Sequence, residues 1–242
     1  MIAIIDYGIG GLGLYKMIRG EFPKLPLLYF SDSGQTPYGK LPKKRLRARL
    51  EKVFDYLRSQ GADKIIVACH SASSVVLETD SDVIGLRSQT MKATMRHKPK
   101  SVGVIGGGRT IRSGFYRDQL KKNGIKVKQR IAQPLSILVE RGEVEGDEVE
   151  KAIRKIIEPI SGCETILLAC THYPVLNTEI KKQFDVKLID PAEELYKSIY
   201  KYLDKNSRGH SRFLTSGNTS LMISAAYKAF NVRIPSVTRV IF

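Results

Sequence analysis

The chain has 242 residues, 42% of them hydrophobic, which is enough for one large or two modest domains with a real core. No stretch approaches the ~20 apolar residues that span a bilayer, and the N-terminus enters an apolar run without a basic region or cleavage site, so we expect neither membrane association nor a signal peptide. The formal net charge of +16 is spread along the chain without interleaved aromatic residues, so we interpret it as a solvated surface that attracts anionic substrates rather than as a nucleic-acid interface.

The chain contains three cysteines. An odd number argues against a disulfide framework and for a reducing compartment. We therefore expect a cytoplasmic protein.

The first part of the chain alternates apolar runs of strand length with helix-like segments. In the longest of these segments, apolar residues recur with a period close to 3.6, which is typical of an amphipathic helix. Fully apolar runs suit strands that are buried on both faces of a parallel sheet. Strands are predicted at 2–5, 25–30, 65–69 and 83–86, and helices at 14–20, 41–59, 71–77 and 88–96.

Three glycines follow the first predicted strand. Gly8, Gly10 and Gly13 match the G-x-G-x-x-G pattern between a strand and a helix, and Asp32 follows about twenty residues later, as in dinucleotide-binding folds. However, Asp6 ends the strand, where its charge would repel a pyrophosphate and would suit an ammonium group. We therefore interpret the glycines as a tight turn and predict no dinucleotide.

The pattern restarts near residue 100, where Ser101 to Gly108 is similar to the opening strand and its glycine turn. Strands are predicted from 101, and at 125–131, 166–170, 186–189 and 212–215, and helices at 110–123, 133–140, 146–160, 177–183, 192–203 and 220–230. This order predicts an α/β fold with two similar doubly wound parallel-sheet domains that face each other across an active-site cleft. We expect residues 1–97 plus 207–242 to form the first domain, with Cys69, and residues 98–206 to form the second, with Cys170.

Two stretches of the chain resemble each other. Residues 65–72 and 166–174 each form an apolar run that ends in Ala-Cys and then turns polar. Ligands of parallel α/β sheets bind beyond the carboxyl ends of the strands. Two facing domains would therefore place Cys69 and Cys170 on opposite sides of one bound molecule.

Three other interpretations stay open at this point. Both cysteines can be ordinary buried thiols, since free Cys is among the most buried residue types. Cys69, His70, Cys170 and His172 can also be zinc ligands, although the sequence has no compact C-x-x-C unit. The chain can equally be a binding protein without catalytic activity.

Several motifs resemble those of the glutamate racemases in the aspartate/glutamate racemase superfamily, over nearly the whole chain. Residues 169–176, A-C-T-H-Y-P-V-L, are close to the family's G-C-T-H-Y-P-L-L, and residues 36–39 match its P-Y-G loop. Weaker matches lie at residues 8–12, at 110–116, at 133–140, where Gln133 replaces a cysteine, and at 189–192. The chain departs from the family at Tyr7 and His70, where smaller residues are usual, so an amino acid other than glutamate is an alternative substrate.

The resemblance implies a cofactor-independent racemase that interconverts L- and D-glutamate, or a related acidic amino acid, and supplies D-glutamate for peptidoglycan. Cys69 and Cys170 would be the two bases, with Asp6 nearer one, His172 nearer the other, and Glu140 as a further catalytic neighbour. Thiols suit this chemistry because their usual pKa of about 8.5 can be lowered into the working range.

The resemblance also implies the substrate contacts. Asp6 would bind the ammonium group, and Tyr38 and Gly39 the side-chain carboxylate. The α-carboxylate would meet His70, Ser71 and Thr171, and the remaining expected contacts are Tyr7, Pro37, Thr110 and His172. We expect an amino acid as the small-molecule substrate, no cofactor, no metal, no nucleic-acid partner and a homodimer.

Overall fold

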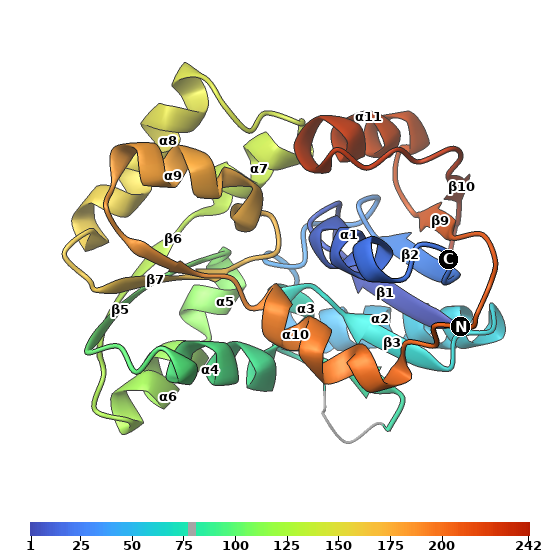
Figure 1. The fold of residues 1–242 in the computed structure, drawn as a ribbon, viewed down its shortest axis with the longest axis horizontal. Coiled ribbons are helices and arrows are strands. Elements are labelled where there is room, and N and C mark those ends of the chain that lie inside the picture. Colours follow the sequence, from blue (N-terminus) through green and yellow to red (C-terminus); the bar gives the residue numbers. More distant parts are fainter. Residues whose placement is uncertain (77–80) are drawn as a thin grey trace.

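The computed structural model describes residues 1–76 and 81–242. It contains two β-sheets, each covered by helices on both faces (Figure 1). Sheet A has the strand order β10-β9-β2-β1-β3-β4, sheet B has the order β6-β5-β7-β8, and the paired strands run parallel. The predicted α/β class with two parallel-sheet domains is therefore confirmed.

Sheet A combines strands from the two ends of the chain. Its strands are β1 (Ile2–Asp6), β2 (Leu27–Ser31), β3 (Lys64–Val67), β4 (Val83–Ile84), β9 (Arg212–Thr215) and β10 (Thr238–Arg239). The register pairs Asp6 with Ser31, Ser31 with Thr215, and Thr215 with Arg239. The carboxyl ends of four strands therefore form one row of residues along the edge of the sheet.

Alternate residues of β1 face opposite sides of sheet A. Ile2 and Ile4 pack in a core with α1 (Leu12–Glu21) and α11 (Thr219–Phe230), whereas Ala3 and Ile5 pack in a core with α2 (Lys43–Ser59). This alternation follows from the two-residue period of a strand. Burial of each large apolar side chain contributes roughly 1.5–3 kcal/mol, so both faces hold β1 in place and fix the position of Asp6.

Sheet B contains β5 (Ser101–Gly106), β6 (Lys126–Ile131), β7 (Thr165–Ala169) and β8 (Lys187–Ile189). One face packs against α4 (Arg87–Arg96) and α6 (Phe115–Lys122), and the other against α7 (Gln133–Glu140), α8 (Asp147–Ile157) and α9 (Asn177–Gln183). The helix α10 (Ala192–Ile199) packs against both α4 and α1. The remaining helical segments are α3 (His70–Ser73), α5 (Gly108–Arg112), η1 (Glu158–Ile160), η2 (Tyr173–Leu176) and η3 (Tyr200–Tyr202).

The structure corrects two of the predicted helices. The helix expected at 110–123 is two helices, α5 and α6, because Gly114 between them adopts the left-handed conformation with φ of 69°. The helix expected at 71–77 is the short α3, which ends at Ser73 before a turn closed by the Val75 amide on the Ala72 carbonyl; its expected last residue, Leu77, lies outside the described residues. The short strand β10 was not predicted, since two residues show no period.

Within the described part of the chain, no helix is both long and apolar enough to cross a membrane.

Asp190 lies between β8 and α10, and its burial makes the stability of the fold depend on pH. It accepts a hydrogen bond from the Ala192 amide at 2.9 Å. Burial raises the pKa of Asp190 to about 6. The hydrogen bond from Ala192 lowers this pKa, and the charge of Glu193 adds to the rise. Because the pKa is higher in the folded chain than in the unfolded one, this group favours folding when it is protonated, and that contribution is lost as the pH rises through about 6.

We therefore expect Asp190→Asn to raise the free energy of unfolding by about 1–3 kcal/mol at pH 8 and to have little effect near pH 4. The amide oxygen of asparagine can still accept the hydrogen bond from Ala192, so only the charge changes. Urea unfolding at both pH values measures the difference. An equal effect at the two pH values would show that ionisation of Asp190 is not the cause.

Candidate active site

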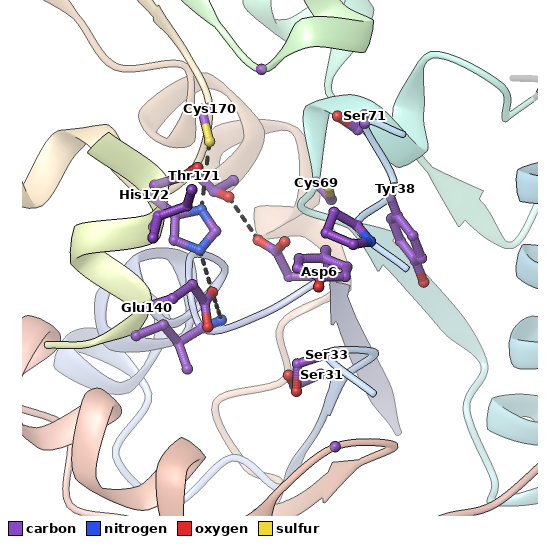
Figure 2. A pocket seen from close by; sticks show the side chains of 18 of the residues that line it. Asp6, Ser31, Ser33, Tyr38, Cys69, Ser71, Glu140, Cys170, Thr171 and His172 are labelled. Atoms are coloured by element: carbon purple, nitrogen blue, oxygen red, sulfur yellow. Dashed lines mark hydrogen bonds and ion pairs between the residues drawn. The ribbon is translucent and has the colours of Figure 1, made fainter. Parts of the chain in front are cut away.

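A cavity of about 590 Å³ lies at the carboxyl ends of the strands of both sheets. Figure 2 shows Cys170, Thr171, His172 and Glu140 on one side of it, Cys69, Ser71 and Tyr38 on the other, and Asp6 between them. Every predicted site residue lines this cavity: Asp6, Tyr7, Pro37, Tyr38, Gly39, Cys69, His70, Ser71, Thr110, Glu140, Cys170, Thr171 and His172. The two cysteine stretches thus come from different sheets and meet at one cavity.

Cys170 is the first member of a hydrogen-bonded chain. Its sulfur lies 3.5 Å from Nδ1 of His172, and Nε2 of His172 forms a short hydrogen bond with Oε1 of Glu140. The same oxygen accepts a hydrogen bond from the Ile9 amide at 2.8 Å, which ties the chain to the glycine turn after β1. Both ring nitrogens of His172 are engaged, so the orientation of the ring is fixed and the ring can pass a proton between the thiol and Glu140.

The neighbouring groups of this hydrogen-bonded series favour the protonated form of His172. Burial opposes its charged form, but the Cys170 sulfur and the Glu140 carboxylate outweigh burial and hold the pKa of His172 well above its usual range. An imidazolium therefore lies beside the Cys170 sulfur. This is the kind of neighbour that activates a thiol for proton transfer.

Asp6 and Cys69 form the other side of the site. The Thr171 hydroxyl donates a hydrogen bond to Oδ2 of Asp6 at 2.7 Å, from the opposite domain. Burial raises the pKa of Asp6, while His172 and the hydrogen bond from Thr171 oppose the rise. Burial and the charge of Asp6 raise the pKa of Cys69 well above its usual range, so Cys69 retains its proton. The site thus has a protonated thiol on one side and a thiol with an imidazolium partner on the other.

Three buried polar atoms on the cavity wall have no hydrogen-bond partner among the described residues. They are Oδ1 of Asp6, Oγ of Ser31 and Oγ1 of Thr110. An unpaired buried polar group costs about 1–3 kcal/mol. A wall with one unpaired carboxylate oxygen and two hydroxyl groups suits a polar ligand with both a cationic and an anionic group.

The loop at residues 36–39 is held by Asp32. Asp32 is fully buried, and it accepts hydrogen bonds from the Tyr38 hydroxyl at 2.7 Å, from Ser216 at 2.7 Å and from Arg49 at 2.6 and 2.9 Å. Arg109, from the second domain, donates to the Tyr38 carbonyl at 3.0 Å. Since the Tyr38 hydroxyl is already bound to Asp32, it is not free to contact a ligand in this arrangement.

Tyr7 and His70 are the bulky residues of the cavity. Nδ1 of His70 lies 2.9 Å from the Tyr116 hydroxyl, and burial lowers the pKa of His70 to about 3, so the ring is neutral. Burial and the charge of Glu140 raise the pKa of Tyr7 to about 12, so its phenol is neutral as well. Among the described residues, no three His, Cys, Asp or Glu side chains are grouped to hold a metal. His70, one of the four ligands in the alternative zinc interpretation, contacts Tyr116.

The glycine turn after β1 admits side chains of the second domain. A Cβ atom on Gly10 would lie 2.7 Å from Nδ1 of His172 and would also overlap Thr171, and a Cβ atom on Gly8 would overlap the Glu140 carboxylate. Gly8 and Gly10 are therefore explained by the close approach of Glu140, Thr171 and His172 to the turn after β1.

We expect Gly10→Ala to lower the rate of the reaction catalysed at this cavity at least about tenfold, because a small misplacement of a catalytic group is costly. Gly13→Ala is the matched control, since a Cβ atom there would lie an ordinary 3.7 Å from Phe230. Steady-state kinetics and circular dichroism of both variants check this. Equal activity of the two folded variants would contradict the close packing of His172 on the turn.

The sequence analysis did not predict some of the residues that line the cavity. Ser31 ends β2 as Asp6 ends β1, so its position at a strand end was an available signal. Arg239 lies in the two-residue β10 and shows no pattern in the sequence. The other missed residues with polar side chains are Ser33, Gln133, Ser136, Arg141, Ser216 and Asn218.

Each of the two parallel sheets has a cysteine at the carboxyl end of one strand, and both cysteines line the same cavity. This arrangement defines a class of two-domain α/β proteins with paired thiols between the domains. Residues 23–199 match the model of the Asp/Glu/hydantoin racemase family. A glutamate racemase of Aquifex pyrophilus is 32% identical over 229 residues, which are 91% of this chain and 90% of that protein.

Solved structures agree with the family match. A glutamate racemase isoform of Bacillus anthracis superposes with a TM-score of 0.89 at 28% identity, over 100% of this chain and 97% of that one. A glutamate racemase of Francisella tularensis, solved in complex with D-glutamate, superposes with a TM-score of 0.88 at 25% identity, over 99% and 97% of the two chains. The chain belongs to the Asp/Glu/hydantoin racemase family and is an isomerase of the amino-acid racemase class.

Proposed function

We propose that the protein interconverts L- and D-glutamate without a cofactor, by proton transfer at Cα between Cys69 and Cys170. The observation that supports this most directly is the convergence of the two thiols on one cavity from two different sheets. The glutamate racemases among its relatives support glutamate as the substrate.

The two thiols have different neighbours, which suits a two-base reaction. In one direction, the Cys170 thiolate removes the Cα proton, and the Cys69 thiol delivers its proton to the opposite face of the carbanion. In the reverse direction, the Cys69 thiolate removes the proton, and the Cys170 thiol delivers its proton to the opposite face of the carbanion. Asp6 is the nearby group that can accept the proton which Cys69 must first lose. Asp6 acts electrostatically on Cys69, and His172 contacts Cys170, so each thiol has its own proton-accepting partner.

The polar groups of the cavity suit the groups of glutamate. The unpaired oxygen of Asp6 would bind the ammonium group, and the Ser71 and Thr110 hydroxyls with neutral His70 would surround the α-carboxylate. Thr171 would lie beside this carboxylate, with its hydroxyl proton donated to Asp6. The backbone of Tyr38 and Gly39, beside Pro37, would bind the side-chain carboxylate.

Tyr7 closes the side-chain end of this site. Its ring lies 5.4 Å from that of Tyr38, and its hydroxyl donates to the Gln35 carbonyl at 3.2 Å. A bulky residue here favours a short substrate, so aspartate is the second candidate.

The biological role follows from the family resemblance. We propose that the protein supplies D-glutamate for peptidoglycan, that it acts in the cytoplasm and that it forms a homodimer.

The test is racemisation by the purified protein after dialysis against EDTA. We expect L- and D-glutamate each to reach the same racemic mixture with no added pyridoxal phosphate, nicotinamide or metal. Chiral chromatography measures the two enantiomers over time. Activity that appears only with one of these additions would contradict the proposal. Faster turnover of aspartate than of glutamate would leave the two-thiol reaction in place and replace the substrate.

A further inference from the structure

The cavity extends beyond the groups that the proposed reaction uses. We define its distal lobe by Ser31, Ser33, Ser216, Asn218 and Arg239, which line the same cavity as the two cysteines. Arg141, which follows Glu140 at the end of α7, also lines this cavity. In Figure 2, Ser31 and Ser33 lie beyond Asp6 on the side away from both cysteines. A volume of about 590 Å³ is in the range of roughly 300–1,000 Å³ that holds drug-sized ligands, which is more room than a free amino acid needs.

The strand register places this lobe relative to Asp6. Asp6, Ser31, Thr215 and Arg239 follow one another across β1, β2, β9 and β10. With about 4.8 Å between neighbouring strands, the backbone of Ser31 lies ~5 Å and that of Arg239 ~14 Å from the backbone of Asp6. Arg239 is thus an arginine on the cavity wall at the far end of the row that begins with the proposed ammonium site.

Two arginines on the cavity wall have no acidic partner among the described residues. Arg141 and Arg239 are exposed and form no ion pair among the described residues. The nearby Asp32 carboxylate is already neutralised by Arg49, and Glu140 is held by His172. Asp6 has an unpaired oxygen, but its backbone lies ~14 Å from that of Arg239, at the other end of the row.

Two further features favour an anion in this lobe. The helix α11, of twelve residues, begins here after Asn218, whose side chain caps the Leu221 amide at 2.9 Å. The N-terminal turn of a helix presents amide groups and a positive dipole end to an anion. Independently, the Ser31 hydroxyl is 1% exposed and lacks a partner among the described residues, so it is a buried donor on the wall of this cavity.

We propose that the distal lobe is an anion-binding subsite for a carboxylate or phosphate group. The anion can be carried by a larger amino-acid derivative whose ammonium group binds at Asp6, or it can be a separate ion. Arg239 and Arg141 supply the charge, and Ser31 supplies the hydrogen bond. Only the first of the two ligand sources rests on the proposed function.

The test is calorimetric binding without turnover, with inorganic phosphate and with γ-L-glutamyl-L-glutamate as probes, and with γ-L-glutamyl-L-glutamine amide as the neutral counterpart of the dipeptide. The variants are Arg239→Gln, Arg141→Gln and Ser31→Ala. Arg154→Gln is the matched control, because Arg154 is exposed on α8 and is not part of the cavity lining. Circular dichroism confirms that each variant is folded.

We expect phosphate or the charged dipeptide to bind the unmodified protein about tenfold more tightly than it binds the Arg239→Gln or Arg141→Gln variant. Binding to Arg154→Gln should be unchanged. Ser31→Ala should weaken binding several-fold without lowering stability, since it removes an unpaired buried hydroxyl. Phosphate that binds alongside saturating glutamate identifies a separate ion, and a dipeptide that competes with glutamate and binds more tightly than its neutral counterpart identifies a tethered anion.

The proposal is overturned if neither probe shows a dependence on Arg239, or if Arg154→Gln weakens binding as much. The binding result is independent of catalysis. A protein that binds phosphate through Arg239 but does not racemise glutamate would support the subsite and contradict the proposed function. A protein that racemises glutamate but binds neither probe through Arg239 would support the proposed function and contradict the subsite.

Discussion

Replacement of either Cys69 or Cys170 by serine should lower the rate of glutamate racemisation by about 10³-fold or more, because a hydroxyl is far too weak an acid to replace a thiol in proton transfer at neutral pH. Each thiol has its own partner, Asp6 for Cys69 and His172 for Cys170, so neither can replace the other. Cys163→Ser is the control, since Cys163 is buried outside the cavity lining and should leave the rate unchanged.

The same two variants should still perform half of the reaction. Loss of HCl from β-chloroalanine needs abstraction of the Cα proton from one face only, with chloride leaving from Cβ. Each variant retains one thiol, so each should eliminate one enantiomer, and the preferred enantiomers should be opposite. Release of pyruvate from each enantiomer, with binding measured alongside, checks this. If both variants prefer the same enantiomer, the thiols do not act from opposite faces.

Asp6→Asn should lower kcat/KM for glutamate by about 10²-fold, the loss typical of a preorganised charged group in a site. The asparagine oxygen can still accept the hydrogen bond from Thr171, whereas the unpaired charge that faces the substrate ammonium is lost. Removal of this charge should also shift alkylation of Cys69 to lower pH, because burial and Asp6 together raise the pKa of that thiol.

The control for Asp6→Asn is Asp185→Asn, which removes an exposed carboxylate. Steady-state kinetics and the pH dependence of Cys69 alkylation, measured in a Cys163→Ser background, separate the two effects. A normal kcat/KM in Asp6→Asn would remove Asp6 from the substrate site. An unchanged alkylation profile would show that Asp6 does not act on Cys69.

The position of the site was predictable because it depends on strand ends. An apolar run fixes a buried strand, and the first polar residues after it lie at the edge of the sheet, as Asp6 and Cys69 do. The repeat of this pattern at Cys170 predicted that the two halves share one site. The family resemblance added Tyr38, Thr110 and Glu140, whose places do not follow from a strand end.

The contacts between the two halves were not predictable. The hydrogen bond from the Ile9 amide to Glu140 joins residues 131 positions apart, and no local period records it. Asp32 was noted in the sequence only as the acidic residue of a dinucleotide-binding pattern, whereas the structure shows that it holds the loop at Tyr38. The break at Gly114 was also missed, because the apolar pattern of this segment does not record the left-handed conformation of a single residue.

The most direct test of the two-thiol site is the fate of the Cα proton in D₂O. L-Glutamate is incubated with the protein for less than one average turnover, and both enantiomers are separated and analysed by mass spectrometry. We expect the D-glutamate formed to contain deuterium at Cα and the remaining L-glutamate to contain almost none, because one thiol removes the proton and the other returns a deuteron to the opposite face. D-Glutamate as the substrate should give the mirror result. Deuterium entering the unconverted enantiomer as fast as the product would mean that a single base serves both faces, and would contradict the roles given to Cys69 and Cys170.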